Sequence, residues 1–268
     1  MKKFTIFLTV VFAVRAHSEV DICLAEVKNE INETIEDSLN ECTNHGHGFR
    51  DKYVEDCNSD PSFTGVRNIK TKEGRIFTAY CDQGWMYIFK RFDGTEDFYR
   101  TWTEYQHGFG YAEKEHFIGL DNLASVLTQG NYKVRIELAM WPGPTSEAKF
   151  AEYSIFNIDR SDKYRLIIGG YRGSMNDSMT QHSNGQQFST YDNDNDLHGT
   201  ENCAVIFKGA WWYKNCRLAN LFSIYAKGPV CPERAACVSW YHWGSDIGHP
   251  SNDYYSFKEA SMKLYRTI

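Results

Sequence analysis

The 268-residue sequence has little proline, no excess of basic charge and, beyond its N-terminus, no long apolar run. Its 6 prolines and 20 glycines exclude a collagen-like stalk, which needs glycine at every third position. A net charge of −6 excludes the electrostatic pattern typical of a nucleic-acid-binding protein. No later stretch is long and apolar enough to span a bilayer, so we expect no nucleic-acid partner and no membrane insertion.

The sequence also lacks the spacing of common catalytic motifs. Its 9 histidines show no HExxH pattern, and it contains neither a GxSxG nucleophile elbow nor a phosphate-binding glycine loop. We therefore predict that the protein is not an enzyme. Its aromatic content of 15%, with 42% hydrophobic and 24% charged residues, is instead typical of a globular chain with one large domain or two small ones.

Residues 1–18 have the parts of a secretory signal peptide. Lys2 and Lys3 give a positive start, residues 4–14 form an apolar run, and small residues follow at positions 16 and 18. The alternative is a short membrane anchor, for which the run is too short. We therefore expect cleavage after residue 18 and a secreted, extracellular protein.

The compartment decides how the 8 cysteines are interpreted. In an exported protein they predict a disulfide framework rather than a zinc or redox site. Eight cysteines allow 105 connectivities, and spacing alone does not choose among them. Two glycosylation sequons, at Asn32 and Asn176, agree with the same compartment.

Residues 19–50 are predicted to form a short amphipathic helix followed by a linker. The helix would pack either against a partner helix or on its own domain. Along it, Cys23 and Cys42 would lie roughly 28 Å apart, too far for a disulfide between them. We therefore expect interchain disulfides in an oligomerisation stem, and a disulfide-linked homo-oligomer. The apolar residues recur at steps of three and four: Leu24, Val27, Ile31, Ile35 and Leu39.

Residues 51–268 are predicted to form an α+β domain with an antiparallel sheet. Apolar and polar residues alternate through 131–140, which indicates a half-buried strand. One helix is expected to carry Phe98, Trp102 and Tyr105 on one face, and another to run from a cap at Asp121. Further strands are expected at 84–92, 151–158 and 164–169.

Residues 192–196, Asp-Asn-Asp-Asn-Asp, place carboxylates at every second position. Calcium needs several oxygen ligands, which such a loop and its carbonyls supply. The EF-hand template fails, because Leu197 stands at its glycine position and Cys203 at its glutamate position. The run therefore indicates either another kind of calcium loop or a solvated polar turn.

Residues 209–216, Gly-Ala-Trp-Trp-Tyr-Lys-Asn-Cys, combine two tryptophans with a cysteine. An aromatic wall of this kind suits the recognition of sugars or acetyl groups. The alternative, which we favour for Trp211 and Trp212, is packing in the core.

A series of motifs runs in order through residues 57–268. They are Tyr80-Cys81-Asp82, Gly84-Trp85, Arg91-Phe92-Asp93-Gly94, Asp97-Phe98-Tyr99-Arg100-Thr101-Trp102, Gly108-Phe109-Gly110, Phe188-Ser189-Thr190, Asn202-Cys203-Ala204 and the block at 209–216. Together they resemble the fibrinogen C-terminal (fibrinogen-related) domain family, particularly its ficolin and tachylectin branch. The resemblance implies a twisted antiparallel sheet, short helices and a loop-rich calcium and ligand region.

The resemblance also implies disulfide pairs. These are Cys57–Cys81 and Cys203–Cys216, which leaves Cys231 and Cys237 as an extra local pair.

By the same resemblance, one Ca²⁺ ion is the expected cofactor. It would be held by the side chains of Asp194 and Asp196 and by backbone carbonyls near His198 and Thr200, with water completing the shell.

The resemblance further implies a pocket for acetylated ligands, formed by Phe207, Arg217 and Tyr255 around the Asn215–Cys216 peptide bond. In the family this bond can be cis. The family usually has histidine where this chain has Arg217, whose fixed charge would shift the preference towards acidic or sulfated sugars.

We therefore expect a secreted, calcium-binding, lectin-like recognition protein of innate defence that binds acetylated or acidic glycans. The alternative is an extracellular protein ligand or adhesion factor, as in the angiopoietin and tenascin branches of the family, which binds a cell-surface receptor through the domain surface.

Overall fold

The computed structural model describes residues 53–267 of the chain. Several predicted features lie outside this part and stay predictions: the signal peptide at 1–18, the stem at 19–50, the sequon at Asn32 and the cysteines Cys23 and Cys42.

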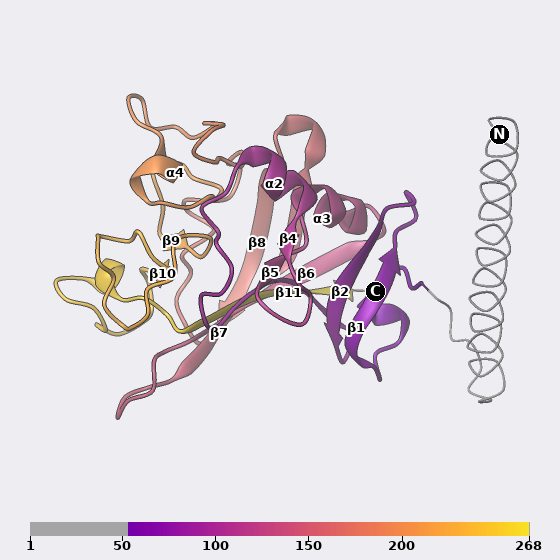
Figure 1. The fold of residues 1–268 in the computed structure, drawn as a ribbon, viewed down its shortest axis with the longest axis horizontal. Helices are drawn as coiled ribbons and strands as arrows, with labels where there is room; N and C mark the ends of the chain where they lie inside the picture. Colours follow the sequence, from indigo (N-terminus) through magenta and orange to yellow (C-terminus); the bar gives the residue numbers. More distant parts are fainter. Residues whose placement is uncertain (1–52, 268) are drawn as a thin grey trace, which may run out of the picture. The chain divides into compact units, whose positions relative to one another are not determined.

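An antiparallel sheet forms the centre of the described part, in the order β1-β2-β3-β11-β6-β7-β8, with β4 and β5 attached beside β3 (Figure 1). This sheet and a few short helices confirm the predicted α+β class. The strands are β1 (Thr64–Lys70), β2 (Ile76–Asp82), β3 (Trp85–Arg91), β4 (Phe109–Gly110), β5 (His116–Phe117), β6 (Asn131–Ala139), β7 (Ala148–Asp159), β8 (Arg165–Gly173) and β11 (Glu259–Thr267).

The last strand, β11, lies in the middle of this sheet. Its Leu264 is paired with Met86 of β3 on one side and with Val134 of β6 on the other. All three side chains are buried. The chain therefore completes its core only when its C-terminal residues are in place.

Two helices, α2 (Trp102–His107) and α3 (Leu120–Leu127), pack against each other (Figure 1). A capping box fixes the start of α2, where Thr101 and Glu104 exchange hydrogen bonds. This start places Phe98 before the helix rather than within it. The expected cap at Asp121 is wrong, because α3 begins after Gly119. A side chain at Gly119, where φ is +96°, would place Cβ 2.6 Å from the backbone carbonyl of His107.

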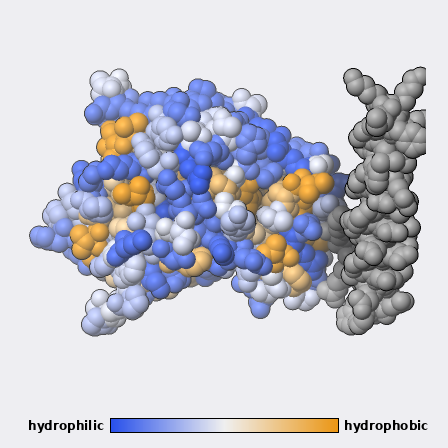
Figure 2. Space-filling view, in the orientation of Figure 1, coloured by the Kyte–Doolittle hydropathy of each residue, from blue (hydrophilic) through white to orange (hydrophobic). Residues whose placement is uncertain are grey.

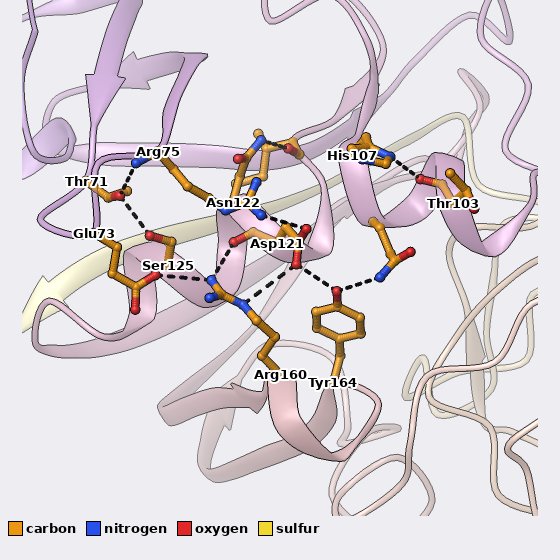
Figure 3. A network of polar contacts seen from close by, with 12 residues as sticks. Thr71, Glu73, Arg75, Thr103, His107, Asp121, Asn122, Ser125, Arg160 and Tyr164 are labelled. Carbon is orange, nitrogen blue, oxygen red and sulfur yellow. Dashed lines mark hydrogen bonds and ion pairs between the residues drawn. The ribbon is translucent and has the colours of Figure 1, made fainter.

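Asp121 instead lies at the centre of a polar network that joins separate parts of the fold (Figure 3). Its carboxylate accepts hydrogen bonds from Arg75 at 2.7 Å and from the Tyr164 hydroxyl at 2.8 Å. Arg160 contacts both Asp121 and Glu73. The network ties the β1–β2 turn to α3 and to the short helix η2 (Arg160–Asp162).

An aromatic cluster around Phe222 fills the core. This residue is fully buried and faces seven rings at centroid distances of 4.7–6.4 Å. Trp211 and Trp212 are among them, so their expected role in core packing fits the structure.

The surface in Figure 2 is mainly hydrophilic, with apolar residues in small separate patches. None of the helices within residues 53–267 combines the length and apolarity that a membrane span needs.

The irregular segment 174–258 lies at the end of the sheet away from the β1–β2 hairpin (Figure 1). It carries the acidic loop and the predicted pocket residues. Its elements are short: α4 (Cys203–Ile206), β9 (Ala219–Asn220), β10 (Ser239–Trp240) and η3 (Asn252–Tyr254).

Candidate functional site

A disulfide between Cys203 and Cys216 holds the candidate site together, with the two Cα atoms 5.7 Å apart. Asn202 caps α4 by accepting hydrogen bonds from the backbone of Ala204 and Val205. Its amide group also donates to the Thr190 carbonyl, at 3.1 Å. The acidic loop is thereby attached to the helix that carries the disulfide.

Within the acidic loop, the structure gives each aspartate a different role. Asp192 accepts hydrogen bonds from the backbone of Trp102, at the start of α2, and from the Thr190 hydroxyl. Asp194 is exposed and accepts from the backbone N–H of Asp196, at 3.1 Å. Asp192 therefore fastens the loop to the domain, whereas Asp194 faces solvent.

The carboxylate of Asp196 is the most constrained of the three. Its two oxygens accept from the backbone N–H groups of His198 and Cys203, each at 2.7 Å. Burial, together with the nearby charge of Asp194, raises the pKa of Asp196. Two adjacent carboxylates of this kind suit a cation.

These residues fit a calcium site only in part. Asp194 and Asp196 supply two side-chain ligands, and no group of three His, Cys, Asp or Glu side chains suited to a metal occurs within residues 53–267. The remaining oxygens would have to be carbonyls, as expected near His198 and Thr200, and water. His198 itself donates its N–H to Asp196, which leaves its carbonyl for such a role.

A cavity of about 480 Å³ lies beside the disulfide. It brings together four of the five predicted pocket residues, Phe207, Asn215, Cys216 and Arg217, and the Asn215–Cys216 peptide bond is cis. The other lining residues are His198, Ile206, Leu218, Arg234, Tyr241 and Asp253.

Two arginines share one buried carboxylate in the wall of this cavity. Arg217 donates from Nη1 to Oδ1 of Asp253 at 2.8 Å, and Arg234 donates from Nε to Oδ2 at 3.0 Å. The Asp253 and Arg217 side chains are 2% and 3% exposed, whereas that of Arg234 is 68% exposed. The group carries one surplus positive charge, and Arg234 presents it to solvent.

This pairing corrects the expected role of Arg217. The sequence suggested that Arg217 supplies a free positive charge to the pocket, but Asp253 neutralises it and the ring of Phe207 lies 4.8 Å from its guanidinium. A buried guanidinium needs such a partner, because an unpaired charge is costly to bury. The accessible cation is Arg234, which the sequence did not indicate.

Tyr255 lies in a different place from the one expected. It is buried in the wall of a separate hollow, where its hydroxyl accepts from the backbone N–H of Trp141 at 3.1 Å. The tyrosine in the cavity beside the disulfide is Tyr241. Its backbone N–H donates to the Leu218 carbonyl, which places it next to Arg217.

His198, predicted for the metal site, also lines the cavity, whereas the other predicted cysteines and Asn176 do not. The structure joins Cys57 to Cys81 and Cys231 to Cys237 by disulfides. Asn176, the second sequon residue, is exposed, and its backbone carbonyl accepts a hydrogen bond from the Trp240 indole.

Comparison with known proteins agrees with this fold. The family model described as the C-terminal globular domain of fibrinogen beta and gamma chains matches residues 54–267. Mouse (Mus musculus) tenascin is 41% identical over 202 residues, which cover 73% of this chain and 9% of the tenascin. Human (Homo sapiens) tenascin-R is 39% identical over 194 residues, covering 70% of this chain and 13% of that protein.

The chain therefore spans about a tenth of the length of these tenascins. Among solved structures, the fibrinogen-like globe domain of human ANGPTL2 is 33% identical with a TM-score of 0.70, covering 77% of this chain and 94% of that one. The relatives named here are tenascins rather than the ficolins and tachylectins that the motifs suggested. The match over residues 54–267 shows that the chain belongs to the fibrinogen C-terminal domain family.

Proposed function

We propose that this chain is an extracellular recognition protein of the adhesion type, which binds an acidic group of a cell-surface or matrix protein in the cavity beside Cys203–Cys216. The observation that carries the proposal is the group of Arg217, Asp253 and Arg234. Its surplus charge is exposed only at Arg234, and a guanidinium binds a carboxylate through paired hydrogen bonds.

Two further observations support this function. The similarity to tenascins favours a protein partner. The family resemblance associates the tenascin branch with adhesion factors that bind a cell-surface receptor. The three disulfides within residues 53–267 favour an extracellular location, since such bonds persist in oxidising compartments.

The second candidate function is that of a lectin in innate defence. Phe207 is only half-buried in the same cavity, beside the Asn215–Cys216 peptide, and an aromatic face next to polar groups suits an acetylated or acidic sugar. We include a calcium ion in both proposed functions. Asp194 and Asp196 would hold the ion and thereby brace the segment that ends at Cys203.

Binding to cultured cells separates the two candidates. The purified chain is applied to cells treated with a protease, with an N-glycan-removing enzyme or with lyases that degrade sulfated glycans. We expect binding to be lost only after the protease, and to fall about tenfold for Arg234→Gln because one charge-assisted contact is removed. Arg165→Gln, which removes another partly exposed arginine from an ion pair, is the matched control.

If binding to cells is lost after N-glycan removal, or if free acetylated sugar competes with it, the proposed protein partner is wrong and the lectin function is favoured. An unchanged affinity of Arg234→Gln would show that the cavity is not the binding site.

A further inference from the structure

The polar face of the central strands forms a second candidate surface, on the sheet rather than in the loop region. Glu152 and Lys263 are buried within it, and its accessible cations include Lys90, Arg135 and Arg172. Partners directly opposite in an antiparallel sheet point to the same side. One row across the sheet is Lys90, Ser261, Glu137 and Phe150. The next is Tyr87, Lys263, Arg135, Glu152 and Arg172.

These rows carry more positive than negative charge. We call the basic face the set of Lys90, Lys133, Arg135, Arg172 and Lys263 with the two carboxylates of Glu137 and Glu152. Asp82 lies opposite Trp85 on the same side of the sheet, so the surplus there is two positive charges, although the whole chain has a net charge of −6. The rim adds Lys149 and Glu259, which cancel.

The two carboxylates are shared, so they do not use up the basic groups. Glu137 is contacted by Arg135 at 2.7 Å and by Lys263 at 2.6 Å. Glu152 is contacted by Arg172 at 2.6 Å and by Lys133 at 3.4 Å. Each guanidinium has five N–H donors, and the side chain of Arg172 is 70% exposed. Donors therefore remain for an outside anion.

Lys90 is the clearest case. Its ammonium group lies 5.3–5.5 Å from the ring centroids of Tyr80, Tyr87 and Phe92. No carboxylate of residues 53–267 lies within ion-pair distance of it. The rings hold the ammonium in place without neutralising its charge.

The basic face is also hollowed. A depression of about 380 Å³ is lined by Lys90, Arg135, Glu137, Phe150 and Ser261, among others. It therefore combines cations, a hydroxyl and aromatic rings along neighbouring strands. This combination suits an extended ligand that carries repeated anionic groups on rings with apolar faces.

We propose that the basic face binds a linear sulfated polysaccharide. Charge complementarity supports this occupant, because the cations are spread over four strands of the sheet, β3, β11, β6 and β8, and not gathered at one point. The proposal is independent of the protein-binding cavity, since the basic face and that cavity have no residue in common.

Calorimetry with the purified chain tests the proposal. The probe is a heparin-derived decasaccharide, compared with the same oligosaccharide after chemical desulfation. We expect binding of the sulfated probe only, and a loss of affinity as salt is raised from roughly 50 mM to 200 mM, because the contacts are electrostatic.

Two variants show where the probe binds. Lys90→Gln combined with Arg172→Gln removes a cation from each end of the basic face, and we expect affinity to fall at least about tenfold. Lys208→Gln is the control, since Lys208 is partly exposed, pairs with Glu233 and lies outside the basic face. We expect a change of less than about twofold, and urea unfolding checks that all variants are folded.

Four results would overturn the proposal. One is that the sulfated probe does not bind at low salt, which would mean that the basic face contains only internal ion pairs. The double variant binds as tightly as the unmodified chain, or the control loses as much affinity as the double variant. Anionic lipid vesicles bind this face and the sulfated probe does not.

Discussion

The guanidinium of Arg217 donates to the carboxylate of Asp253 at 2.8 Å, and both side chains are almost completely buried. Asp253 lies 36 residues further along the chain, in η3, so this ion pair joins two parts of the irregular segment that are distant in sequence. It fixes the wall of the cavity and leaves Arg234 as the exposed cation.

The first prediction concerns this pair. Asp253→Asn should lower the free energy of unfolding by about 3–5 kcal/mol, because it leaves the charge of Arg217 buried without a counter-charge. Urea denaturation measures the change. Arg234→Gln breaks the solvent-exposed contact to the same carboxylate and should cost less than about 1 kcal/mol. Equal losses for the two variants would contradict the central role of Arg217.

The strands differ in how far the sequence predicts them. The alternation in residues 131–140 predicted β6 to within one residue, because one face is buried and the other is not. Residues Thr64–Lys70 of β1 show no such alternation, since only one of the seven is buried. In β11, five successive residues are buried, so the period of two is lost there too.

The sequence also predicts only some of the residues of the candidate site. Motifs near in sequence identified the acidic loop and the Cys203–Cys216 segment. Arg234 and Asp253 come from irregular segments that no local pattern connects to Arg217. Tyr255, which the resemblance places in the cavity, follows the extra disulfide Cys231–Cys237 in sequence and lines a separate hollow.

The second prediction concerns Phe222, at the centre of the aromatic cluster. Its ring is 4.8 Å from that of Trp211 and 4.7 Å from that of Phe89. Phe222→Ala should lower the free energy of unfolding by about 3–5 kcal/mol, because it opens a cavity among packed rings. Tyr111→Ala, at a 75% exposed position, should change it by about 0.5 kcal/mol or less. Urea denaturation of both variants checks this difference, and a small effect at Phe222 would refute it.

The third prediction is a pH dependence from His116. Burial lowers the pKa of this ring, which lies between the carbonyls of Lys114 and Tyr87. In the unfolded chain the pKa is about 6.5, so the unfolded state binds the proton more readily. The contribution to stability is therefore complete above about pH 6.5 and is lost as pH falls below it.

The urea midpoint should accordingly fall between about pH 7 and pH 5, and His116→Gln should reduce this fall. His249→Gln, at an exposed position, is the control and should leave the pH profile unchanged. An identical profile for His116→Gln would assign the pH dependence to other groups.

The fourth prediction concerns assembly. Cys23 and Cys42 are expected to form interchain disulfides, because a helix between them would hold them too far apart to pair. Non-reducing gels should show covalent multimers that become monomers on reduction. The double variant Cys23→Ser with Cys42→Ser should be monomeric under both conditions. Migration of the unmodified chain as a monomer without reductant would refute the stem.

The last prediction concerns calcium at Asp194 and Asp196. An ion bound only by the folded chain stabilises it, by about 2.7 kcal/mol when its concentration is 100 times the dissociation constant. The melting temperature should therefore rise with calcium and fall with a chelator. Asp194→Ala should abolish the rise, because it removes one of two carboxylate ligands without disturbing the backbone contacts of Asp196 to His198 and Cys203.

Asp246→Ala is the matched control for the metal, since it removes an exposed carboxylate from a separate hollow and changes the net charge equally. It should retain the full response to calcium. Binding of the chain to cells should then decrease with chelator as well, because the ion would brace the Cys203–Cys216 segment beside the cavity. A melting temperature that responds to neither calcium nor chelator would make residues 192–196 a solvated turn, held to the domain by the contact of Asp192 with Trp102.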